Sequence, residues 1–321
     1  MKFESVVETL NISGTYRKIY GKEIMPLSKG VILTYSPLTN KFLFQPFSHN
    51  TDESCIQQLS TLMRKNLLFY CYGEDEVVTH YQKGTFSDLE QAATFAYKNR
   101  LPSRLANSDG LPGEVLLDLL VQLYEKDSYK LAVRPILRQN DNNEIKGYDL
   151  TYFTLHDEKI TLWLGQAKLG EKSYCKAGIH NDLLEKFKKE YLAGQMFFVC
   201  DKQIGVTKES QVITDIINQI NLATLEENEP KRAAFLLDCF KKNNISINIP
   251  CLAAYEESDV YCDESCIYQK IEKQLDEMQK YFSKNTYSFE GFNPRIILYI
   301  FPLKDLALLR DDKGGFYHGL R

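Results

Sequence analysis

Residues 147–169 read GYDLTYFTLHDEKITLWLGQAKL, and this stretch carries the clearest structural signal in the chain. Two runs rich in β-branched and aromatic residues, 148–155 and 160–168, lie on either side of the polar segment 156–159. Two such runs separated by a short polar turn are typical of a β-hairpin. The stretch therefore predicts a pair of antiparallel strands.

The second run of this hairpin carries residues whose chemistry depends on strand alternation. Side chains point alternately to the two faces of a strand, so we expect Gln166 and Lys168 on one face and Ala167 on the other. Asp149 lies near the start of the first run. We expect its carboxylate to converge with the Gln166 amide oxygen and the Lys168 ammonium group.

A helix is predicted upstream of the hairpin, and it supplies a second acid. Pro112 opens this helix, and residues 114–125 repeat leucines at helical spacing on one side and polar residues on the other. The polar residues are Glu114, Asp118, Gln122 and Glu125. A polar stripe on a helix is usually exposed to solvent, so Glu114 is distinguished only by its place before Asp149 and Lys168.

In this order, the acid on the helix, Asp149 and the triplet 166–168 resemble the PD-(D/E)xK nuclease superfamily. That superfamily has an acid on its first helix, an Asp on the second core strand and (E/Q)-x-K on the third. More closely, the segments GEVLLDLL, GYDL and LGQAKL are similar to the HamA family of nuclease subunits of the bacterial Hachiman antiphage system. Two positions depart from the pattern: Tyr148 replaces the motif proline, and Gln166 replaces the commoner acid.

The resemblance implies an α/β fold with a restriction-endonuclease-like core, in which helices flank a mixed sheet, and a site for Mg²⁺ or Mn²⁺. Glu114 and Asp149 would bind the metal ion through their carboxylates, since hard divalent cations prefer oxygen ligands. The Gln166 side-chain oxygen and the Ala167 carbonyl would complete the protein ligands. Lys168 would hold or deprotonate the attacking water and stabilise developing negative charge.

Six lysines and four acidic residues lie between positions 168 and 190. In the superfamily, the helix that follows the active strand packs beside the DNA, so Lys172, Lys176 and Lys188 are candidates for phosphate contacts. Lysines interspersed with acids are also typical of a solvated helix face. Both interpretations of the three lysines stay open.

The composition is that of a globular protein, with 44% hydrophobic and 26% charged residues in 321. A formal charge of −4 argues against a protein that holds nucleic acid by overall positive charge alone. No secretory signal is evident in MKFESVVETL, and the longest apolar runs are too short to cross a bilayer. Eight cysteines without a repeated short spacing favour reduced thiols. We therefore expect a cytoplasmic protein without a membrane partner.

The remaining patterns predict an accessory α+β region at residues 1–85 and a nuclease domain at 86–321. Hairpins are expected at 30–47 and 66–81, helices at 53–65, 88–98, 182–192, 209–220, 230–241 and 264–282, and further strands at 130–137, 195–199, 245–255 and 295–303. Ser87 and Glu90 have the spacing of a capping box for the helix at 88–98.

Three functions remain open at this point. The first is a metal-dependent DNase effector of antiphage defence, for which the resemblance implies DNA as substrate and a HamB-like helicase as the regulating partner. The second is another enzyme of the superfamily, a restriction endonuclease or a junction resolvase. The third is a catalytically silent module that binds DNA or a partner, in which Gln166 marks lost chemistry.

Overall fold

The computed structural model describes residues 12–101, 110–125, 127–133, 147–157, 159–201 and 207–321. Within them, one mixed sheet has the strand order β1-β3-β8-β7-β6-β5-β4, and β2 pairs with β3 outside this path. The strands are β1 (Ile32–Thr34), β2 (Leu38–Thr39), β3 (Leu43–His49), β4 (Ser128–Ala132), β5 (Leu150–His156), β6 (Lys159–Gly170), β7 (Ser246–Glu256) and β8 (Arg295–Leu303). Strands β3, β8, β7 and β6 run parallel, whereas β5 and β4 continue the sheet in antiparallel pairs.

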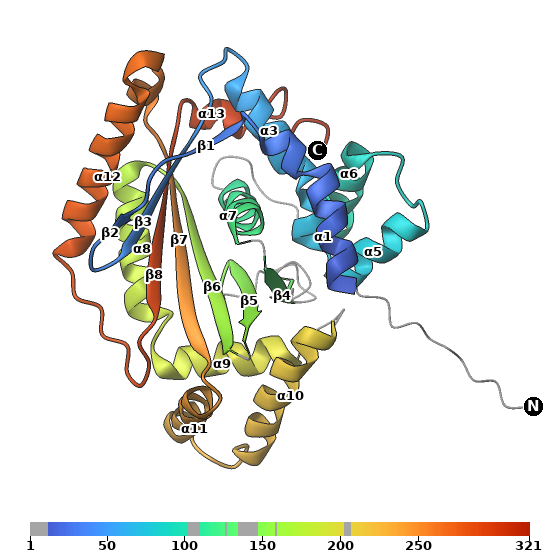
Figure 1. Cartoon of the computed structure of the whole chain (residues 1–321), viewed down its shortest axis with the longest axis vertical. Coiled ribbons are helices and arrows are strands. Elements are labelled where there is room, and N and C mark those ends of the chain that lie inside the picture. Colours follow the sequence, from blue (N-terminus) through green and yellow to red (C-terminus); the bar gives the residue numbers. More distant parts are fainter. Residues whose placement is uncertain (1–11, 102–109, 126, 134–146, 158, 202–206) are drawn as a thin grey trace, which may run out of the picture.

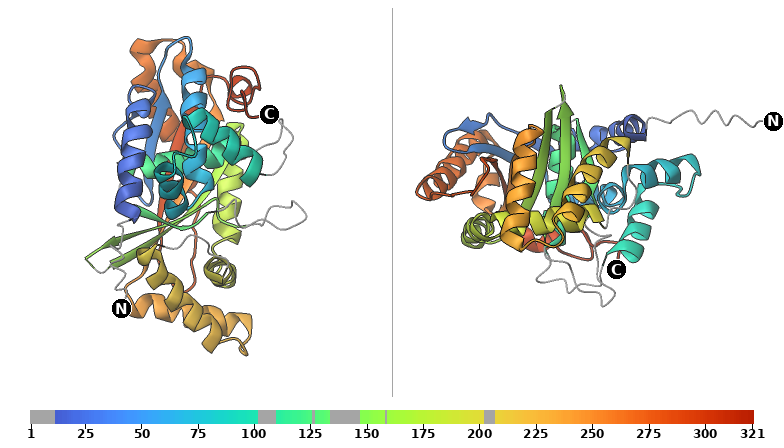
Figure 2. Two further views of the ribbon diagram at one scale, coloured as in Figure 1. Left: turned by 90° about the vertical axis from the view of Figure 1, so that its right-hand side faces the viewer. Right: turned by 90° about the horizontal axis from the view of Figure 1, so that it is seen from below.

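Helices cover both faces of this sheet and divide the interior into two large cores (Figure 1). One core lies between the sheet and α7, with the N-terminal helices packed outside α7. The other lies beneath helices α8 to α12, and Figure 2 shows the N-terminal helices and α12 on opposite sides of the strands. The main helices are α1 (Ile12–Glu23), α3 (Cys55–Lys65), α4 (Leu67–Cys71), α5 (Glu74–Gln82), α6 (Leu89–Arg100), α7 (Leu111–Tyr124), α8 (Lys172–Glu185), α9 (Lys189–Asp201), α10 (Lys208–Ala223), α11 (Glu229–Lys242) and α12 (Ile267–Ser283). Short helices complete the set at α2 (Met25–Ser28), η3 (Ser258–Tyr261), η4 (Glu264–Cys266) and α13 (Leu306–Leu309).

The predicted central hairpin is confirmed. Strands β5 and β6 pair antiparallel from Leu150 opposite Gly165 to His156 opposite Lys159. Asp157 in the turn has φ of +46°, a left-handed conformation that Asp tolerates better than most residues because its short side chain can hydrogen-bond locally. The two runs of β-branched and aromatic residues on either side of a polar turn therefore identified both strands and their turn.

The N-terminal part of the chain extends the same sheet. The hairpin expected at 30–47 is present, because β1 and β2 both pair antiparallel with β3. Strand β3 then runs parallel to β8. The boundary proposed at residue 85 stays a prediction, and three strands from the first 85 residues complete one edge of the sheet.

The polar stripe of α7 is buried, so the interpretation of it as a solvated face is wrong. Glu114, Asp118 and Gln122 are 7%, 3% and 0% exposed. The second layer of helices covers them: Tyr16 of α1 donates to Gln122 at 2.5 Å, and Asn66 donates to Asp118 at 2.8 Å. These hydrogen bonds compensate the polar groups for the loss of water.

Two predicted strand regions are helices. The expected hairpin at 66–81 is instead the helix pair α4 and α5, and the expected strand at 195–199 lies within α9. Residues 67–72 are all buried. Such a short, continuously apolar run has no polar face to reveal its period, so a buried helix and a buried strand look alike in sequence.

Two predicted helix boundaries also differ. The helix expected at 182–192 is the end of α8 and the start of α9, separated by residues 186–188, and Leu184 in the last turn of α8 is 41% exposed. Helix α6 begins one residue later than predicted, because the Asp88 side chain accepts the Gln91 backbone N–H at 2.8 Å and Ser87 lies outside the helix. In the described part of the chain, no helix is both long and apolar enough to cross a membrane.

Candidate active site

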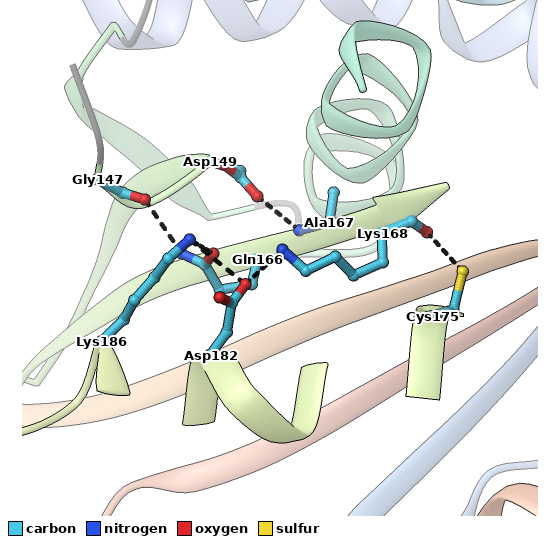
Figure 3. Close-up of polar contacts among 8 residues, drawn as sticks. All are labelled: Gly147, Asp149, Gln166, Ala167, Lys168, Cys175, Asp182 and Lys186. Carbon is cyan, nitrogen blue, oxygen red and sulfur yellow. Dashed lines mark hydrogen bonds and ion pairs between the residues drawn. The ribbon is translucent and has the colours of Figure 1, made fainter. Parts of the chain in front are cut away.

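Asp149 marks the point where β5 begins to pair with β6. Its backbone N–H donates to the Gly165 carbonyl at 2.9 Å, and its Oδ2 atom accepts the Ala167 backbone N–H at 2.8 Å (Figure 3). The carboxylate thus accepts a hydrogen bond that a residue preceding β5 would accept if the strand pairing continued. Asp149 is 8% exposed, so this carboxylate lies in a largely desolvated edge of the sheet.

The backbone of Ala167 faces the same edge. Within a strand, the N–H and C=O groups of one residue point to the same neighbouring strand. Because β5 pairing stops at Leu150 opposite Gly165, the Ala167 carbonyl points toward the edge where Asp149 lies. In the part of the chain that the structure describes, no strand pairs with β6 beyond Gly165 on this side, so the Asp149 carboxylate and the Ala167 carbonyl share this edge.

Gln166 and Lys168 point to the opposite face of β6 from Ala167, toward α8 (Figure 3). Lys186 Nζ donates to Gln166 Oε1 at 2.5 Å, while Gln166 Nε2 donates to the Gly147 carbonyl at 3.4 Å. The Lys168 ammonium lies 2.6 Å from Asp182 Oδ2. Both side chains are thus engaged by residues of α8 or the turn that follows it.

The Lys168 side chain lies directly against Gly178 of α8. A Cβ atom at Gly178 would lie 2.9 Å from Lys168 Cε and 3.0 Å from its Cδ, which is closer than carbon atoms pack. Next to this contact, the Cys175 thiol donates to the carbonyls of Lys168 and Ala254, at 3.4 and 3.3 Å. Burial raises the pKa of Cys175 to about 12, so the thiol stays protonated and acts as a donor.

Glu114 approaches β6 from the other face, in the first turn of α7. A Cβ atom at Gly113 would lie 3.0 Å from the Leu169 Cβ and 3.8 Å from the Ala167 Cβ, so this turn packs directly on residues 167–169. The Glu114 Oε2 atom accepts the Tyr70 hydroxyl at 2.7 Å. The first turn of α7 therefore lies against residues 167–169, whereas the Gln166 and Lys168 side chains are engaged on the α8 side of β6.

A family model named HamA matches residues 29–317, nearly the whole chain. The chain belongs to the HamA family. No curated protein matches it in sequence. The match extends well beyond the middle third that carries the motifs, and it identifies this HamA-family chain as a component of the Hachiman antiphage defence.

The donor atoms of this HamA site fit a hard cation in part. Among the described residues, no three His, Cys, Asp or Glu side chains gather into a metal-binding group. Two carboxylates, Glu114 and Asp149, and the Ala167 carbonyl are oxygen donors of the kind that Mg²⁺ and Mn²⁺ prefer. The Gln166 oxygen already accepts from Lys186, and an ammonium group beside it disfavours a divalent cation there.

Lys172 is engaged by acids of this chain. Its ammonium lies 2.5 Å from Glu257 and 3.0 Å from Glu277, and 5.2 Å from the Tyr255 ring centre. Burial lowers the pKa of Lys172, but hydrogen bonds to Glu257 and Glu277 raise it by more, so the residue stays charged. A phosphate would have to compete with two carboxylates for this lysine.

The other two candidate DNA-binding lysines lie further along the same segment. Lys188 is exposed and pairs with Glu185 at 2.7 Å, which is an arrangement of small energetic value. The Lys176 ammonium lies 5.2 Å from the Tyr281 ring centre. Of the three lysines, Lys188 is the one that could exchange its partner for a phosphate at the lowest cost.

Sequence reasoning missed Asp182 and Lys186 as parts of the site. Both lie among the six lysines and four acidic residues counted between positions 168 and 190, where neither was distinguished from the others. In the HamA chain, Lys186 Nζ also lies 3.3 Å from Asp182 Oδ2. The four-residue spacing of an acid and a lysine was the available signal, because such pairs meet on a helix surface.

Proposed function

We propose that this HamA-family chain is a metal-dependent deoxyribonuclease that hydrolyses phosphodiester bonds as the effector of its defence system. The observation that carries the proposal is the Asp149 carboxylate bound to the Ala167 N–H at the open edge of β6. Lys168 is the next residue of β6 after Ala167, and its ammonium group forms an ion pair with Asp182. Helix α7 brings Glu114 to the same segment from the other face.

Glu114, Asp149 and the Ala167 carbonyl would hold Mg²⁺ or Mn²⁺. When bound, such an ion polarises the phosphoryl oxygens and lowers the pKa of water. Gln166 contributes no negative charge, and its oxygen would have to leave Lys186 before it could bind a cation. The protein by itself is therefore expected to hold the ion weakly, with substrate phosphate contributing further oxygen ligands.

Lys168 is the residue that acts on water and on developing charge. Its ammonium group donates hydrogen bonds to the attacking water or to a phosphoryl oxygen, where a fixed positive charge in a desolvated site is most effective. Asp182 orients the Lys168 side chain through the 2.6 Å ion pair. Lys186 adds a second positive charge on the same face of β6.

A helicase subunit of the HamB type is the proposed partner. The chain has a net charge of −4, and Lys172 and Lys188 are paired with acids. Independent binding to DNA depends on a positive surface that releases counterions from the phosphates. A partner that holds DNA would supply this, and it would also restrain the nuclease until DNA is threatened.

The test is cleavage of supercoiled plasmid with Mg²⁺ or Mn²⁺, with and without the helicase encoded beside this chain. Wild-type protein should cleave, and EDTA or the substitution Lys168→Ala should stop cleavage. Lys284→Ala is the matched control, since Lys284 is exposed and its side chain contacts no acid among the described residues. Cleavage by Lys168→Ala at the wild-type rate would disprove the assignment.

A silent binding module is the second candidate, and the Lys186–Gln166 contact favours it. Lys186 Nζ lies 2.5 Å from Gln166 Oε1, the atom at the position where the superfamily pattern has a metal ligand. A positive charge so close to this atom is compatible with a site that holds no metal ion. This candidate predicts no cleavage under any condition. It also predicts that Asp149→Ala leaves DNA or helicase binding unchanged.

A further inference from the structure

A cavity of about 200 Å³ lies far from the candidate active site, where β3, β8 and the end of α7 meet. Its lining includes four aromatic residues, Tyr35, Phe47, Tyr124 and Tyr299, together with Gln45 and Glu125. Glu114 and Glu125 lie at opposite ends of α7, and eleven residues of helix separate them by ~17 Å at 1.5 Å per residue. The cavity is therefore independent of the proposed nuclease chemistry.

The aromatic walls of this cavity are set at different angles. The Phe47 ring packs edge-on against Tyr299, with centroids 5.4 Å apart and planes at 88°, and lies tilted by 42° against Tyr124 at 5.2 Å. The rings line the cavity at different angles, and Tyr124, 41% exposed, offers the most open aromatic surface among them, whereas Phe47 and Tyr299 are 1% and 3% exposed. Such a surface attracts a positive charge through the negative faces of the rings.

Glu125 places a carboxylate on this aromatic surface. It is partly buried, and its side chain forms no hydrogen bond or ion pair with any other residue that the structure describes. Burial raises the pKa of Glu125, and the exposed guanidinium of Arg295 offsets this only in part. A partly buried carboxylate is stabilised by a cation that binds beside it.

Tyr299 provides a second polar group without a partner. It is 3% exposed, and its hydroxyl makes no hydrogen bond within the described chain. Burial raises its pKa, and the Glu125 carboxylate adds to this effect, so the two groups are close enough to interact. The hydroxyl oxygen is not one of the buried side-chain atoms that lack a partner, so it is accessible at the cavity wall, where it can form a hydrogen bond with a ligand.

The end of α7 adds a third attraction for positive charge. Tyr124 is the last residue of this 14-residue helix, and Glu125 is its C-cap. The C-terminus of a helix carries partial negative charge, which favours cations and disfavours acids. Glu125 is thus in a locally unfavourable position, which is typical of residues that serve a ligand.

We propose that this cavity binds an organic cation, an ammonium or guanidinium group carried by a small molecule or by a lysine or arginine side chain. The aromatic faces, the Glu125 carboxylate and the carbonyl end of α7 attract the charge, and the Tyr299 hydroxyl is an acceptor for one N–H group. A nucleobase fits less well, because the rings do not form parallel stacking faces and Glu125 repels a phosphate backbone.

The experiment compares choline with its uncharged isostere dimethylbutanol by calorimetry on the full chain. Choline should bind saturably, and dimethylbutanol should not. Glu125→Gln, which keeps the shape and removes the charge, should weaken choline binding about tenfold. Glu226→Gln is the control, since Glu226 is exposed and distant from the cavity lining.

Two further variants protect the test against misfolding. Tyr299→Phe keeps the ring and should lower affinity for butylammonium, which has N–H donors, more than for choline, which has none. Tyr124→Leu should weaken both cations. Melting curves identify any variant that has unfolded, and the Glu125→Gln comparison then stands alone, because Gln keeps the shape of this side chain, which forms no hydrogen bond or ion pair among the described residues.

A second arm distinguishes the source of the cation. Butylammonium and butylguanidinium represent free amines, and end-blocked peptides with a central lysine or arginine represent a partner protein. Binding of either set, dependent on Glu125, supports the site. Equal affinity for choline and dimethylbutanol, unchanged affinity in Glu125→Gln, or binding of adenosine in place of the cations would overturn it.

Discussion

The ammonium group of Lys168 on β6 lies 2.6 Å from Asp182 Oδ2 on α8, and the same oxygen lies 3.3 Å from Lys186 Nζ. One carboxylate oxygen therefore holds two lysines that flank Gln166. Without Asp182, the two positive charges would repel each other across a partly buried gap. This arrangement makes Asp182 the residue that positions the cationic side of the candidate site.

We expect Asp182→Asn to lower the rate of DNA cleavage about tenfold, because Lys168 would no longer be held in place. Lys168→Met should cost about a hundredfold or more, since it removes the charge itself. Single-turnover cleavage rates at saturating Mn²⁺ measure both. The exposed Asp276 gives the control substitution Asp276→Asn. A faster Asp182→Asn enzyme would mean that Asp182 restrains Lys168 instead of positioning it.

The contact between Lys186 and Gln166 leads to a prediction about metal affinity. Gln166→Glu adds a carboxylate, but Lys186 at 2.5 Å would neutralise it, so this variant alone should change the metal requirement little. Gln166→Glu combined with Lys186→Met should lower the Mg²⁺ concentration needed for half-maximal cleavage about tenfold.

Titration of cleavage against Mg²⁺ for the four combinations of these two substitutions measures the coupling directly. The coupling is absent if the two effects simply add. Strict additivity would show that residue 166 and Lys186 do not interact in the active enzyme.

Tyr70 is expected to position Glu114 through its hydroxyl, which donates to Glu114 Oε2 at 2.7 Å. Tyr70→Phe should lower cleavage about tenfold and the free energy of unfolding by about 1 kcal/mol. Tyr20→Phe is the matched control, because the Tyr20 hydroxyl is also buried and donates to Asn66 Oδ1 at 3.1 Å. Both variants should lose similar stability, and an equal loss of activity in both would refute a specific role for Tyr70.

Asp118 is expected to be the most sensitive polar residue of the interior. Its carboxylate accepts hydrogen bonds from Asn66, Gln122 and Tyr152 at 2.8, 2.7 and 2.6 Å. Asp118→Asn would turn an N–H group toward these donors, so we expect the free energy of unfolding to fall by roughly 3 kcal/mol. Urea denaturation measures this. A fall in the free energy of unfolding smaller than that caused by a typical surface substitution would show that the hydrogen-bond network around Asp118 rearranges freely.

His49 predicts a stability loss in mild acid. Its ring stacks on Tyr261 with centroids 4.0 Å apart, and its Nε2 accepts the Lys304 backbone N–H at 3.0 Å. Its Nδ1 therefore carries the proton and donates to the Asn50 carbonyl at 2.7 Å. Burial lowers the pKa of His49 to about 4, against the ordinary value of 6.5.

Because the folded pKa of His49 is depressed, the unfolded chain binds the extra proton first as the pH falls. The contribution of neutral His49 is fully present above pH 6.5 and is lost between pH 6.5 and about 4. The loss amounts to roughly 3 kcal/mol. Urea denaturation at pH 7 and near pH 4 should show this loss in wild type and much less of it in His49→Gln. Identical pH dependence in the two proteins would contradict the prediction.

Local sequence patterns were sufficient where side chains alternate or recur with a regular period. The hairpin of β5 and β6, helix α7 and the strands β7 and β8 were predicted close to their observed bounds. Each is long enough, or has a regular enough pattern of apolar and polar residues, for its helix or strand period to be recognised in the sequence. Such patterns failed for α4, whose residues are all buried, and for α9, where the short apolar run 196–200 does not distinguish a helix from a strand.

The order of Glu114, Asp149 and Lys168 along the chain was readable because each lies on an element that local patterns predict. The residues that contact these side chains could not be predicted in this way. Tyr70 reaches Glu114 from 44 positions away, and Asp182 meets Lys168 because α8 packs against β6. Pairings of this kind depend on which faces of distant elements meet, and no periodicity within one element encodes that.

The two ends of α7 show the same difference between what the sequence and what the tertiary structure determines. Sequence alone predicts the helix and its two polar termini, whereas the packing of the N-terminal helices buries its polar side, and β3 and β8 build an aromatic cavity around Glu125. Residues 47, 125 and 299 are far apart along the chain and come together only when the sheet closes over the helix. Burial, and with it the altered pKa of a carboxylate or an imidazole, is a property of that packing and not of the residues themselves.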